Sequence, residues 1–403
     1  MQHNDVNFNK NGIEALAIIP ARGQSKGIIK KNLQYVNGKP LIAYAIEAAR
    51  QAQYINRVVV STDDVEIAAV AKRHGASVVM RPSDISGDMA SSELALLHVL
   101  DHLEATESYK PLILAFLQCT SPLTLPRDID GTIEKMVDEQ ADSALAVVPF
   151  HYFLWNHNED GTAGGINHDK NMRLMRQQRK NQFLEAGAVY AMMVDGFHKH
   201  KHRFFGKTVL YQMPIDRCFE IDEWVDLKIA AVLMRERQDE MILSVLPDAL
   251  EAVVFDFDGV FTDNRVRIDQ NGIESVTCSR GDGMGIARLK NKDITLLVLS
   301  TEKNPVVEAR CNKLGITFRQ GLEDKKQSLI KWSEENKIDL ANTIFVGNDI
   351  NDAECLQTVG CSVVVNDAHP GVKSMAQIVL NAPGGHGAIR ELADLIERKG
   401  KVA

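Results

Sequence analysis

The chain has 403 residues, of which 45% are hydrophobic and 25% charged, a composition that excludes a disordered, collagen-like or disulfide-stapled chain and favours a globular protein. At roughly 100–200 residues per domain, this length predicts two or three domains. The 54 acidic residues outnumber the 46 Lys and Arg and leave a net charge of −8, which argues against a nucleic-acid-binding surface for the chain as a whole.

The sequence shows no export or membrane signal. Residues 1–10 are polar and lack the apolar core of a secretory signal, and no window approaches the ~20 apolar residues that span a bilayer. The six cysteines are scattered without a Cys-x-x-Cys pair, as expected of free thiols in a reducing compartment. We therefore expect a cytoplasmic protein that acts on small molecules, with no nucleic-acid or membrane partner and with a flexible tail at residues 1–12.

Short β-branched apolar runs alternate with segments of helical spacing from end to end. In the first part we expect strands at residues 15–20, 57–61, 77–80, 112–118 and 143–148, and helices at 40–53, 65–74, 92–103 and 127–139. A charged helical stretch from 222 to about 240 ends this series. Further strands are expected at 252–255, 294–299, 343–346 and 362–365. Such alternation predicts parallel βαβ units, whose sheets are covered by helices on both faces.

We therefore expect an α/β protein with two doubly wound, mainly parallel-sheet domains. The join is expected near residues 242–249, which gives a first domain at 13–241 and a second at 249–403. No low-complexity linker separates the two parts, so we expect them to pack together.

The first expected strand runs into a loop rich in cations. Arg22, Lys26, Lys30 and Lys31 lie within ten residues, and two glycines among them allow main-chain amides to approach an anion. The loop follows the carboxyl end of a strand, where open α/β sheets bind ligands, but it matches neither the GxGxxG fingerprint nor the P-loop. It predicts a nucleotide or phosphate site, and the alternative is a solvated basic turn.

Sequence strings in the first part of the chain resemble those of the acylneuraminate (sialic acid) cytidylyltransferases. In order, they occupy residues 19–32, 61–63, 81–88, 117–123, 187–190 and 220–226. The resemblance spans residue 15 to about 235 and implies a Rossmann-like nucleotidyltransferase domain. That domain would transfer CMP from CTP to a nonulosonic (sialic-type) acid and release pyrophosphate. The alternative sugar is an eight-carbon 3-deoxy-octulosonate.

The resemblance also implies binding roles and a Mg²⁺ cofactor. The residues are Arg22, Ser25, Lys26, Lys31 and Asn32 for the triphosphate, Arg81 and Ser92 for cytosine, Gln118 for the sugar acid, and Glu220 and Asp222 for Mg²⁺. Arg22 and Lys26 would also be catalytic, because neutralising the charge of the triphosphate oxygens favours the departure of pyrophosphate. Mg²⁺ suits the acidic pair because it prefers carboxylate oxygens and substrate phosphates.

Three positions depart from the family pattern. Glu220 stands where some members have Asp, and Cys119 stands where Pro is usual. Ala186 precedes Gly187 where Asn is expected, which changes a contact on the sugar side.

Residues 150–184 form an insert rich in His, Asn, Gln and Arg, with Arg173, Arg176, Arg179 and Lys180 among them. A long connection of this kind is usually a functional or binding element. Two interpretations stay open: a cationic lobe that receives the sugar carboxylate, or an arm that contacts a second copy of the chain.

The second part of the chain begins with two carboxylates just past a buried strand. Asp256 and Asp258 follow the strand at 252–255, a spacing that lets one carboxylate attack phosphorus while the other transfers a proton. The string 256–263, followed by the later strings around 300, 325 and 347–352, resembles the haloacid dehalogenase (HAD) superfamily. That resemblance implies Asp256 as nucleophile, Asp258 as acid/base, Ser300 and Lys325 as phosphate ligands, and Asp256, Asp258 and Asp349 as Mg²⁺ ligands.

Within that superfamily, the strings at 280–285 and 384–391 resemble the capless 3-deoxy-octulosonate phosphate phosphatases. The second domain would then either dephosphorylate the sugar acid 9-phosphate or drive oligomerisation, and both alternatives stay open. In that family a hairpin near 265–277 drives tetramer formation, so we expect a homo-oligomer, either a dimer or a tetramer.

A third reading is a non-enzymatic scaffold that keeps a nucleotide-binding fold. Such a protein would have lost its metal carboxylates or its loop cations. Lys26, Lys31, Asp222, Asp256 and Asp349 are all present, which favours an enzyme.

Overall fold

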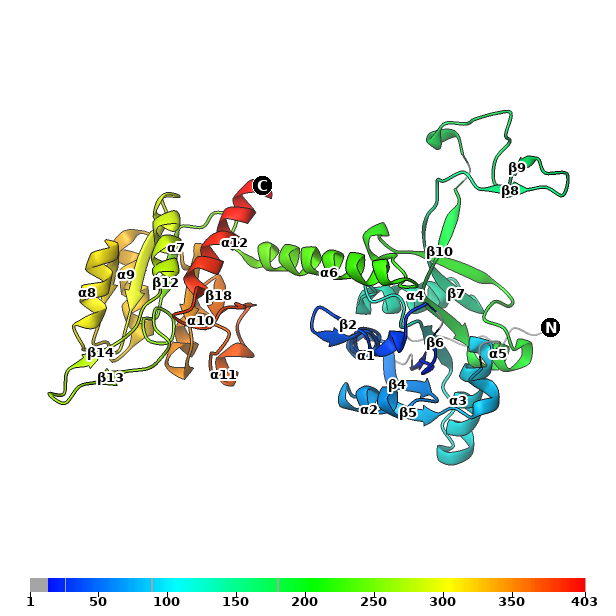
Figure 1. The fold of residues 1–403 in the computed structure, drawn as a ribbon, viewed down its shortest axis with the longest axis horizontal. Coiled ribbons are helices and arrows are strands. Elements are labelled where there is room, and N and C mark those ends of the chain that lie inside the picture. The colour runs from blue at the N-terminus through cyan, green and yellow to red at the C-terminus, as the bar shows by residue number, and fades with distance from the viewer. Residues whose placement is uncertain (1–13, 26, 88–89, 180, 403) are drawn as a thin grey trace. The chain divides into compact units, whose positions relative to one another are not determined.

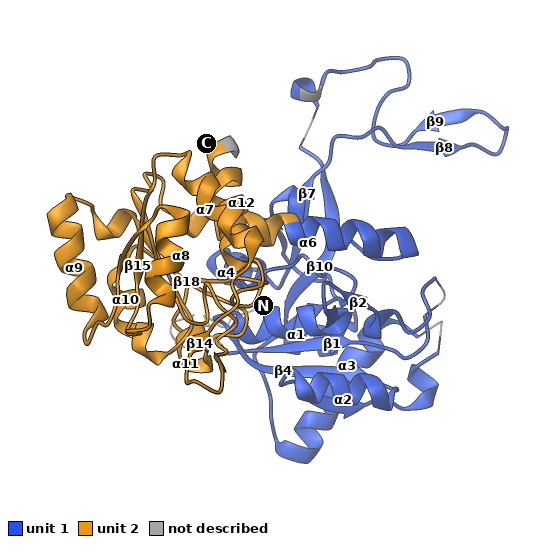
Figure 2. Ribbon diagram, turned by 60° about the vertical axis from the view of Figure 1, so that its left-hand side comes forward, with its two compact units in different colours: residues 1–235 blue, residues 236–403 orange. Residues whose placement is uncertain are grey.

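Figure 1 shows the computed structural model, which describes residues 14–25, 27–87, 90–179 and 181–402. The chain divides into two compact units, unit 1 (residues 1–235) and unit 2 (residues 236–403), which Figure 2 colours separately. The division falls within helix α6 (Trp224–Val245), a few residues before the join expected at 242–249. The tail expected at residues 1–12 and the cation Lys26 lie outside the described residues.

Unit 1 is built on a seven-stranded sheet with the strand order β11-β7-β10-β6-β1-β4-β5. Its strands are β1 (Ala15–Pro20), β4 (Ile55–Thr62), β5 (Ser77–Met80), β6 (Ile113–Leu117), β7 (Ser143–Pro149), β10 (Phe183–Met193) and β11 (Thr208–Gln212). Neighbouring strands are parallel except that β10 runs antiparallel to β6 and β7. The mainly parallel α/β fold is therefore confirmed, and the carboxyl ends of β1, β4 and β6 share one edge of the sheet.

Helices cover both faces of this sheet. They are α1 (Leu41–Gln51), α2 (Val65–Arg73), α3 (Ser92–Glu107), α4 (Pro126–Asp138) and α5 (Val194–His200). Successive residues of β1 face opposite sides: Ala17 and Ile19 pack with α1, α2 and α4, whereas Leu16 and Ile18 pack with α3 and α5. Because both faces of β1 are buried, its sequence is apolar without alternation.

Short elements complete unit 1. They are 3₁₀ turns at Lys31–Leu33, Ser83–Ile85, Arg176–Gln178 and Ile215–Arg217, and hairpins formed by β2 (Tyr35–Val36) with β3 (Lys39–Pro40) and by β8 (Trp155–His157) with β9 (Ala163–Gly165). The hairpin β8–β9 belongs to the insert 150–184, which extends away from the sheet of unit 1 (Figure 1). The insert thus has little contact with the core that positions the cavity described below.

Unit 2 is built on a six-stranded sheet with the order β16-β15-β12-β17-β18-β19, in which every neighbouring pair is parallel. The strands are β12 (Ala252–Phe255), β15 (Thr295–Leu299), β16 (Thr317–Arg319), β17 (Thr343–Gly347), β18 (Cys361–Val364) and β19 (Ile378–Val379). A separate hairpin consists of β13 (Arg267–Ile268) and β14 (Glu274–Ser275).

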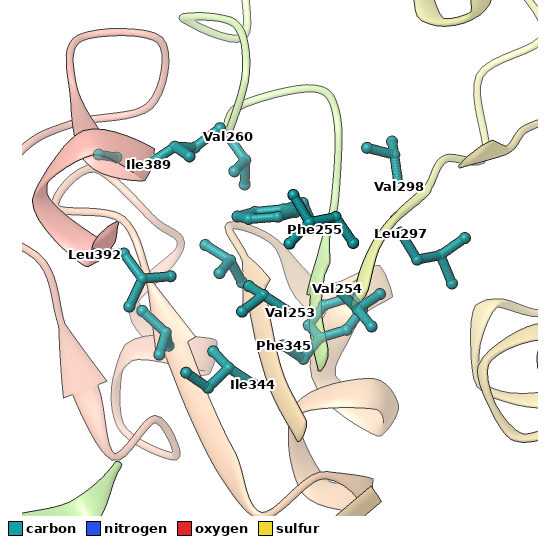
Figure 3. Close-up of a cluster of buried hydrophobic side chains, with 14 of the residues drawn as sticks. Val253, Val254, Phe255, Val260, Leu297, Val298, Ile344, Phe345, Ile389 and Leu392 are labelled. Carbon is teal, nitrogen blue, oxygen red and sulfur yellow. The ribbon is translucent and has the colours of Figure 1, made fainter. Parts of the chain in front are cut away.

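The helices of unit 2 follow its strands. They are α7 (Arg280–Lys290), α8 (Val306–Leu314), α9 (Lys325–Asn336), α10 (Ala353–Thr358), α11 (Pro370–Lys373) and α12 (Ala388–Val402), with 3₁₀ turns at Leu340–Asn342 and Ile350–Asp352. The core centres on β12, whose Val253, Val254 and Phe255 are fully buried among side chains of β15, β17 and α12 (Figure 3). This buried central strand delivers Asp256 at its carboxyl end.

The six cysteines are free thiols. Cys119, Cys311, Cys355 and Cys361 are buried, and burial raises the pKa of each of these thiols to about 12. They are therefore protonated packing side chains at neutral pH. Among the described residues, no helix combines the length and the apolar character that crossing a membrane requires.

Candidate active sites

A cavity of about 560 Å³ opens at the carboxyl edge of the unit 1 sheet. The structure brings together there every described residue for which the family resemblance implied a role in this unit: Arg22, Ser25, Lys31, Asn32, Arg81, Ser92, Gln118, Glu220 and Asp222. These side chains come from the loop after β1, the segment after β5, the start of α3, the end of β6 and the segment before α6. Cavities of this size suit small-molecule ligands.

The loop after β1 is shaped by its own polar side chains. Asn32 Nδ2 donates to the carbonyl oxygen of Arg22 (3.1 Å), which closes the loop across ten positions. Ser25 Oγ accepts from the main-chain N–H of Lys31 (3.3 Å). Ser25 and Asn32 therefore hold the loop backbone in place, so that its charged side chains line a preformed cavity.

Lys31 joins this loop to the acidic segment before α6. Its Nζ donates to the carbonyl oxygen of Ile221 (2.8 Å) and to Asp222 Oδ1 (3.2 Å). The adjacent Lys30 instead pairs with Glu66 on the surface, with 2.7 Å between Nζ and Oε1. Of these two neighbouring lysines, only Lys31 lines the cavity.

Glu220 and Asp222 place two carboxylates on the same wall. Burial raises the pKa of Glu220, and the charge of Asp222 raises it further. A cation between the two carboxylates would relieve this unfavourable arrangement. Gly187 makes room for Glu220: its φ is +59°, and a Cβ at this position would lie 1.9 Å from Glu220 Oε1. Only glycine leaves the carboxylate where it is.

These two carboxylates fit Mg²⁺ as a cofactor. Among the described residues, no three His, Cys, Asp or Glu side chains gather so as to hold a metal ion by themselves. Mg²⁺ does not need such a cage, because it is commonly bound by one or two carboxylates and completes its shell with substrate phosphates and water. Glu220 and Asp222 would supply the protein ligands in unit 1.

Arg81, which directly follows β5, also lines the cavity. Its Nη2 donates to the carbonyl oxygen of Ser61 (2.9 Å) and its Nε to Ser61 Oγ (3.2 Å). Burial lowers the pKa of Arg81, although Asp63 opposes this effect. The guanidinium is thus fixed at the end of β4 and offers its remaining N–H groups to a ligand.

A cation that lies against two stacked aromatic rings supports the wall near Ser92. The guanidinium of Arg203 lies 4.9 Å from the ring centroid of Phe116 and 4.7 Å from that of Tyr190. Its Nε donates to Glu93 Oε1 (2.7 Å), and Glu93 follows Ser92 in the first turn of α3. Sequence reasoning missed these residues, because no local pattern marks contacts between segments so far apart in the chain.

In unit 2, a buried lysine bridges two carboxylates at the end of β12. Lys325 Nζ donates to Asp256 Oδ1 (2.7 Å) and to Asp352 Oδ1 (2.8 Å). All three residues are buried. Burial and the charge of Asp352 raise the pKa of Asp256, against the lowering effect of Lys325. The other oxygen of Asp352 accepts from the main-chain N–H of Asn348 (2.9 Å), which ties the loop after β17 to this network.

A second cavity, of about 290 Å³, lies over this network. Its lining consists of Asp256, Asp258, Asn264, Thr301, Asn348, Asp349 and Asn351. The three carboxylates expected to bind Mg²⁺ therefore all line this cavity, although they do not form a metal-binding cluster by themselves. Substrate and water oxygens would have to complete the ligands of the ion. Burial raises the pKa of Asp258, and nearby Glu302 raises it further, which suits a group that donates a proton.

The expected phosphate ligands of unit 2 lie deeper than the cavity lining. Ser300 is buried, and its Oγ accepts from the main-chain N–H of Glu302 (3.0 Å). Lys325 is buried beneath the carboxylates. Four further residues line the cavity although no role was expected for them: Asn264, Thr301, Asn348 and Asn351. The last three lie within two positions of Ser300 or Asp349, and this closeness in the sequence is the signal that could have identified them.

Two arginines of the insert 150–184, Arg173 and Arg179, are engaged within the insert itself, and Lys180 lies outside the described residues. The guanidinium groups of Arg173 and Arg179 lie 4.5 and 4.4 Å from the ring centroid of Phe153. Arg179 also donates to Gln182 Oε1 (2.9 Å) and to the main chain of His151. These contacts give both cations a structural role in the insert.

Family models match both units. A cytidylyltransferase model matches residues 16–236, and a haloacid dehalogenase-like hydrolase model matches residues 318–392. The N-acylneuraminate cytidylyltransferase A of Danio rerio is 28% identical over 397 residues, which cover 96% of this chain and 90% of that protein.

Two further relatives each match one unit. The pseudaminic acid cytidylyltransferase of Campylobacter jejuni is 30% identical over 226 residues, 55% of this chain and 96% of that protein. The 3-deoxy-D-manno-octulosonate 8-phosphate phosphatase KdsC of Escherichia coli is 35% identical over 148 residues, 36% of this chain and 79% of that protein.

Proposed function

Because the chain belongs to the cytidylyltransferase family, we propose that unit 1 transfers CMP from CTP to a nonulosonic (sialic-type) acid and releases pyrophosphate. The observation that carries this proposal is the single cavity in which loop cations face two carboxylates. A triphosphate needs cations around its oxygens, and its metal needs carboxylates beside them. The sugar class follows the relatives, which are named for N-acylneuraminate and pseudaminic acid.

The reaction proposed for unit 1 is an in-line displacement at the α-phosphorus of CTP. The anomeric hydroxyl of the sugar acid loses its proton to solvent, and its oxygen forms a bond to phosphorus as the bond to pyrophosphate breaks. Arg22 and Lys31 would neutralise the triphosphate oxygens, and Lys26 would assist them from the same loop. Arg81 and Ser92 would hold cytosine, and Gln118 the sugar acid. Bound at Glu220 and Asp222, Mg²⁺ would supply further charge neutralisation.

The test is pyrophosphate release from CTP and Mg²⁺ with a panel of sugar acids. The panel contains neuraminate, its deaminated analogue, a legionaminate-type acid and 3-deoxy-octulosonate. We expect turnover with nine-carbon acids, and its loss in Asp222→Asn. Asp216→Asn, an exposed site in the preceding turn that does not line the cavity, should keep the activity. Turnover with the octulosonate alone would favour the eight-carbon alternative, and turnover with ATP or UTP but not CTP would refute the proposal.

Unit 2 is proposed to be a phosphatase for the phosphorylated sugar acid, so that one chain would release the sugar acid and then activate it. Asp256 would attack the phosphorus, and Asp258 would protonate the departing sugar oxygen. Water then cleaves the aspartyl phosphate and releases phosphate. The buried Lys325 would keep the Asp256 carboxylate oriented through its 2.7 Å hydrogen bond. Support comes from the cavity that collects Asp256, Asp258 and Asp349.

Phosphate release from a nonulosonate 9-phosphate tests the role of unit 2. We expect Mg²⁺-dependent release by the full chain, loss of release in Asp256→Asn, and retention of CMP transfer by that variant. Release that does not exceed the Asp256→Asn background would leave oligomerisation as the role of unit 2.

We also propose that the chain forms a homo-oligomer, either a dimer or a tetramer. The insert 150–184 exposes large apolar side chains, among them Tyr152, Trp155, Met172 and Met175. Exposed apolar clusters on soluble proteins commonly mark interaction sites. Analytical ultracentrifugation of the full chain checks this point, and a monomer at micromolar concentration would exclude it. The free thiols support a reducing, cytoplasmic setting.

A further inference from the structure

The loop that follows β12 has an unusual backbone at the edge of the unit 2 cavity. Asn264 adopts a left-handed conformation, with φ of +61°, which residues other than glycine, asparagine and aspartate rarely adopt. Glycine would meet this backbone requirement with the least strain. The chain instead places an amide side chain here, and that residue lines the cavity together with Asp256 and Asp258.

The backbone of Asn264 is tied to the loop that carries Asp258. The hydroxyl of Thr262, which is fully buried, accepts from the main-chain N–H of Gly259 (3.1 Å) and of Asn264 (3.3 Å). Gly385 packs against Thr262 so closely that a Cβ on it would lie 2.6 Å from the Thr262 carbonyl carbon. The backbone of Asn264 is therefore held in place, which fixes the point at the cavity from which its side chain extends.

The rest of the cavity wall is neutral and polar. Apart from its three carboxylates, the described lining consists of Asn264, Thr301, Asn348 and Asn351. Amides and hydroxyls can each donate and accept hydrogen bonds, which matches the hydroxyl groups of a sugar. An aromatic leaving group would need apolar walls, and this lining contains no apolar side chain.

We propose that Asn264 is a specificity-determining residue that hydrogen-bonds a hydroxyl group of the departing sugar. The proposal rests on the phosphatase function proposed for unit 2. Asn264 acts on the sugar and takes no part in the attack on phosphorus, which belongs to Asp256. Its contribution is therefore greatest for a phosphorylated sugar acid and smallest for a phosphorylated compound whose leaving group is too small to reach it.

The test compares two substrates in the full chain with Mg²⁺: a nonulosonate 9-phosphate and acetyl phosphate. The measured quantity is the ratio of kcat/KM for the sugar acid phosphate to kcat/KM for acetyl phosphate. In Asn264→Gly we expect this ratio to fall about twofold to tenfold, the effect of losing one hydrogen bond. Glycine accepts φ of +61°, so this variant should fold, which far-UV circular dichroism checks.

Two further variants sharpen the comparison. Asn271→Gly, in the turn of the hairpin β13–β14 and outside the cavity lining, should leave the ratio unchanged. Asn264→Asp keeps the left-handed backbone and the side-chain size but adds a negative charge. It should lower the ratio more than Asn264→Gly does, because a carboxylate loses the amide donor and repels an anionic sugar acid.

The outcomes separate this proposal from the phosphatase function itself. If wild type hydrolyses acetyl phosphate above the Asp256→Asn background and Asn264→Gly leaves the ratio unchanged, Asn264 is not a specificity residue and the phosphatase function stands. If wild type hydrolyses neither substrate above that background, both proposals are overturned.

Discussion

The guanidinium of Arg217 lies 3.1 Å from the carboxylate of Asp128, and both side chains are buried, with 3% and 0% exposed. Asp128 lies in the first turn of α4 and also accepts from the main-chain N–H of Leu125 (2.9 Å). Arg217 ends a 3₁₀ turn three residues before Glu220. The ion pair therefore anchors the segment that carries the proposed metal carboxylates to the body of unit 1.

Replacing Arg217 should destabilise unit 1 strongly. Arg217→Met removes the cation that faces a buried carboxylate, and breaking a buried ion pair from one side costs about 3–5 kcal/mol of unfolding free energy. Adding Asp128→Asn should recover part of this loss. The substitution removes the unpaired buried negative charge, and the amide oxygen of Asn can still accept the hydrogen bond from the main-chain N–H of Leu125. Urea unfolding followed by circular dichroism measures both effects. Equal stabilities of wild type and Arg217→Met would contradict the anchoring role.

The two adjacent lysines of the cationic loop should differ in their effect on catalysis. Lys31→Met removes a cation from the cavity and its hydrogen bond to Asp222, so kcat for CMP transfer should fall about 10²–10³-fold. Lys30→Met, which loses only a surface ion pair with Glu66, should change kcat less than about threefold. Steady-state pyrophosphate release measures both. Similar losses of kcat in the two variants would show that the total positive charge of the loop, and not the position of Lys31 at the cavity, determines the rate.

Substitution of Gly187 should disturb the metal site through Glu220. Gly187→Ala puts a Cβ 1.9 Å from Glu220 Oε1 and strains a left-handed backbone, so the carboxylate must move. We expect the Mg²⁺ concentration for half-maximal CMP transfer to rise about tenfold or more. Gly161→Ala is the matched control, because Gly161 has φ of +80° and no neighbour within 4 Å of an added Cβ. A Mg²⁺ titration that Gly187→Ala leaves unchanged would remove Glu220 from the metal site.

The pair formed by Glu93 and Arg203 should make stability depend on pH. Burial opposes ionisation of Glu93, but the hydrogen bond and charge of Arg203 outweigh it and hold the pKa of Glu93 below its usual 4.5. A lowered pKa in the folded state stabilises the fold above pH 4.5, and this contribution is lost as the pH falls through the lowered value. Glu93→Gln should therefore cost about 1–2 kcal/mol at pH 7.

The pH profile distinguishes this effect from a loss of packing. The stability difference between wild type and Glu93→Gln should be constant from pH 7 to about 5 and shrink below pH 4.5. Urea unfolding across this range measures it, with the exposed Glu159→Gln as a control that should show no difference. A difference that stays constant down to pH 3 would mean that the charge of Glu93 is not involved.

The strands that carry the two sites could be predicted from the sequence because their burial follows from neighbours in the chain. The apolar run of β1 and the cationic loop after it, like β12 and Asp256, are consecutive residues whose geometry depends on local backbone preferences. β10 was not expected, since it enters the sheet antiparallel from an insert and follows no βαβ pattern. Its motif residues 187–190 were recognised without their strand.

Most of the described residues that were expected at the two candidate sites line the two cavities, but their contacts with one another could not be predicted. From the order of the segments in the chain, cations were expected at the end of β1 and carboxylates before α6. Only the folded chain brings Lys31 to Asp222, 191 positions away, while it directs the adjacent Lys30 to the surface. The same holds for Arg203 against Phe116 and for Asn264 at the second cavity.

The sequence alone thus determined the α/β class and the cytidylyltransferase family, together with the motif residues at the strand ends, because these depend on runs of neighbouring residues. Tertiary structure alone decided that Arg217 anchors the acidic segment, that Gly187 makes room for Glu220, and that Ser300 and Lys325 lie beneath the unit 2 cavity. Burial, close approach and charge pairing arise between distant segments, and no local pattern encodes which of two neighbouring side chains will meet a partner.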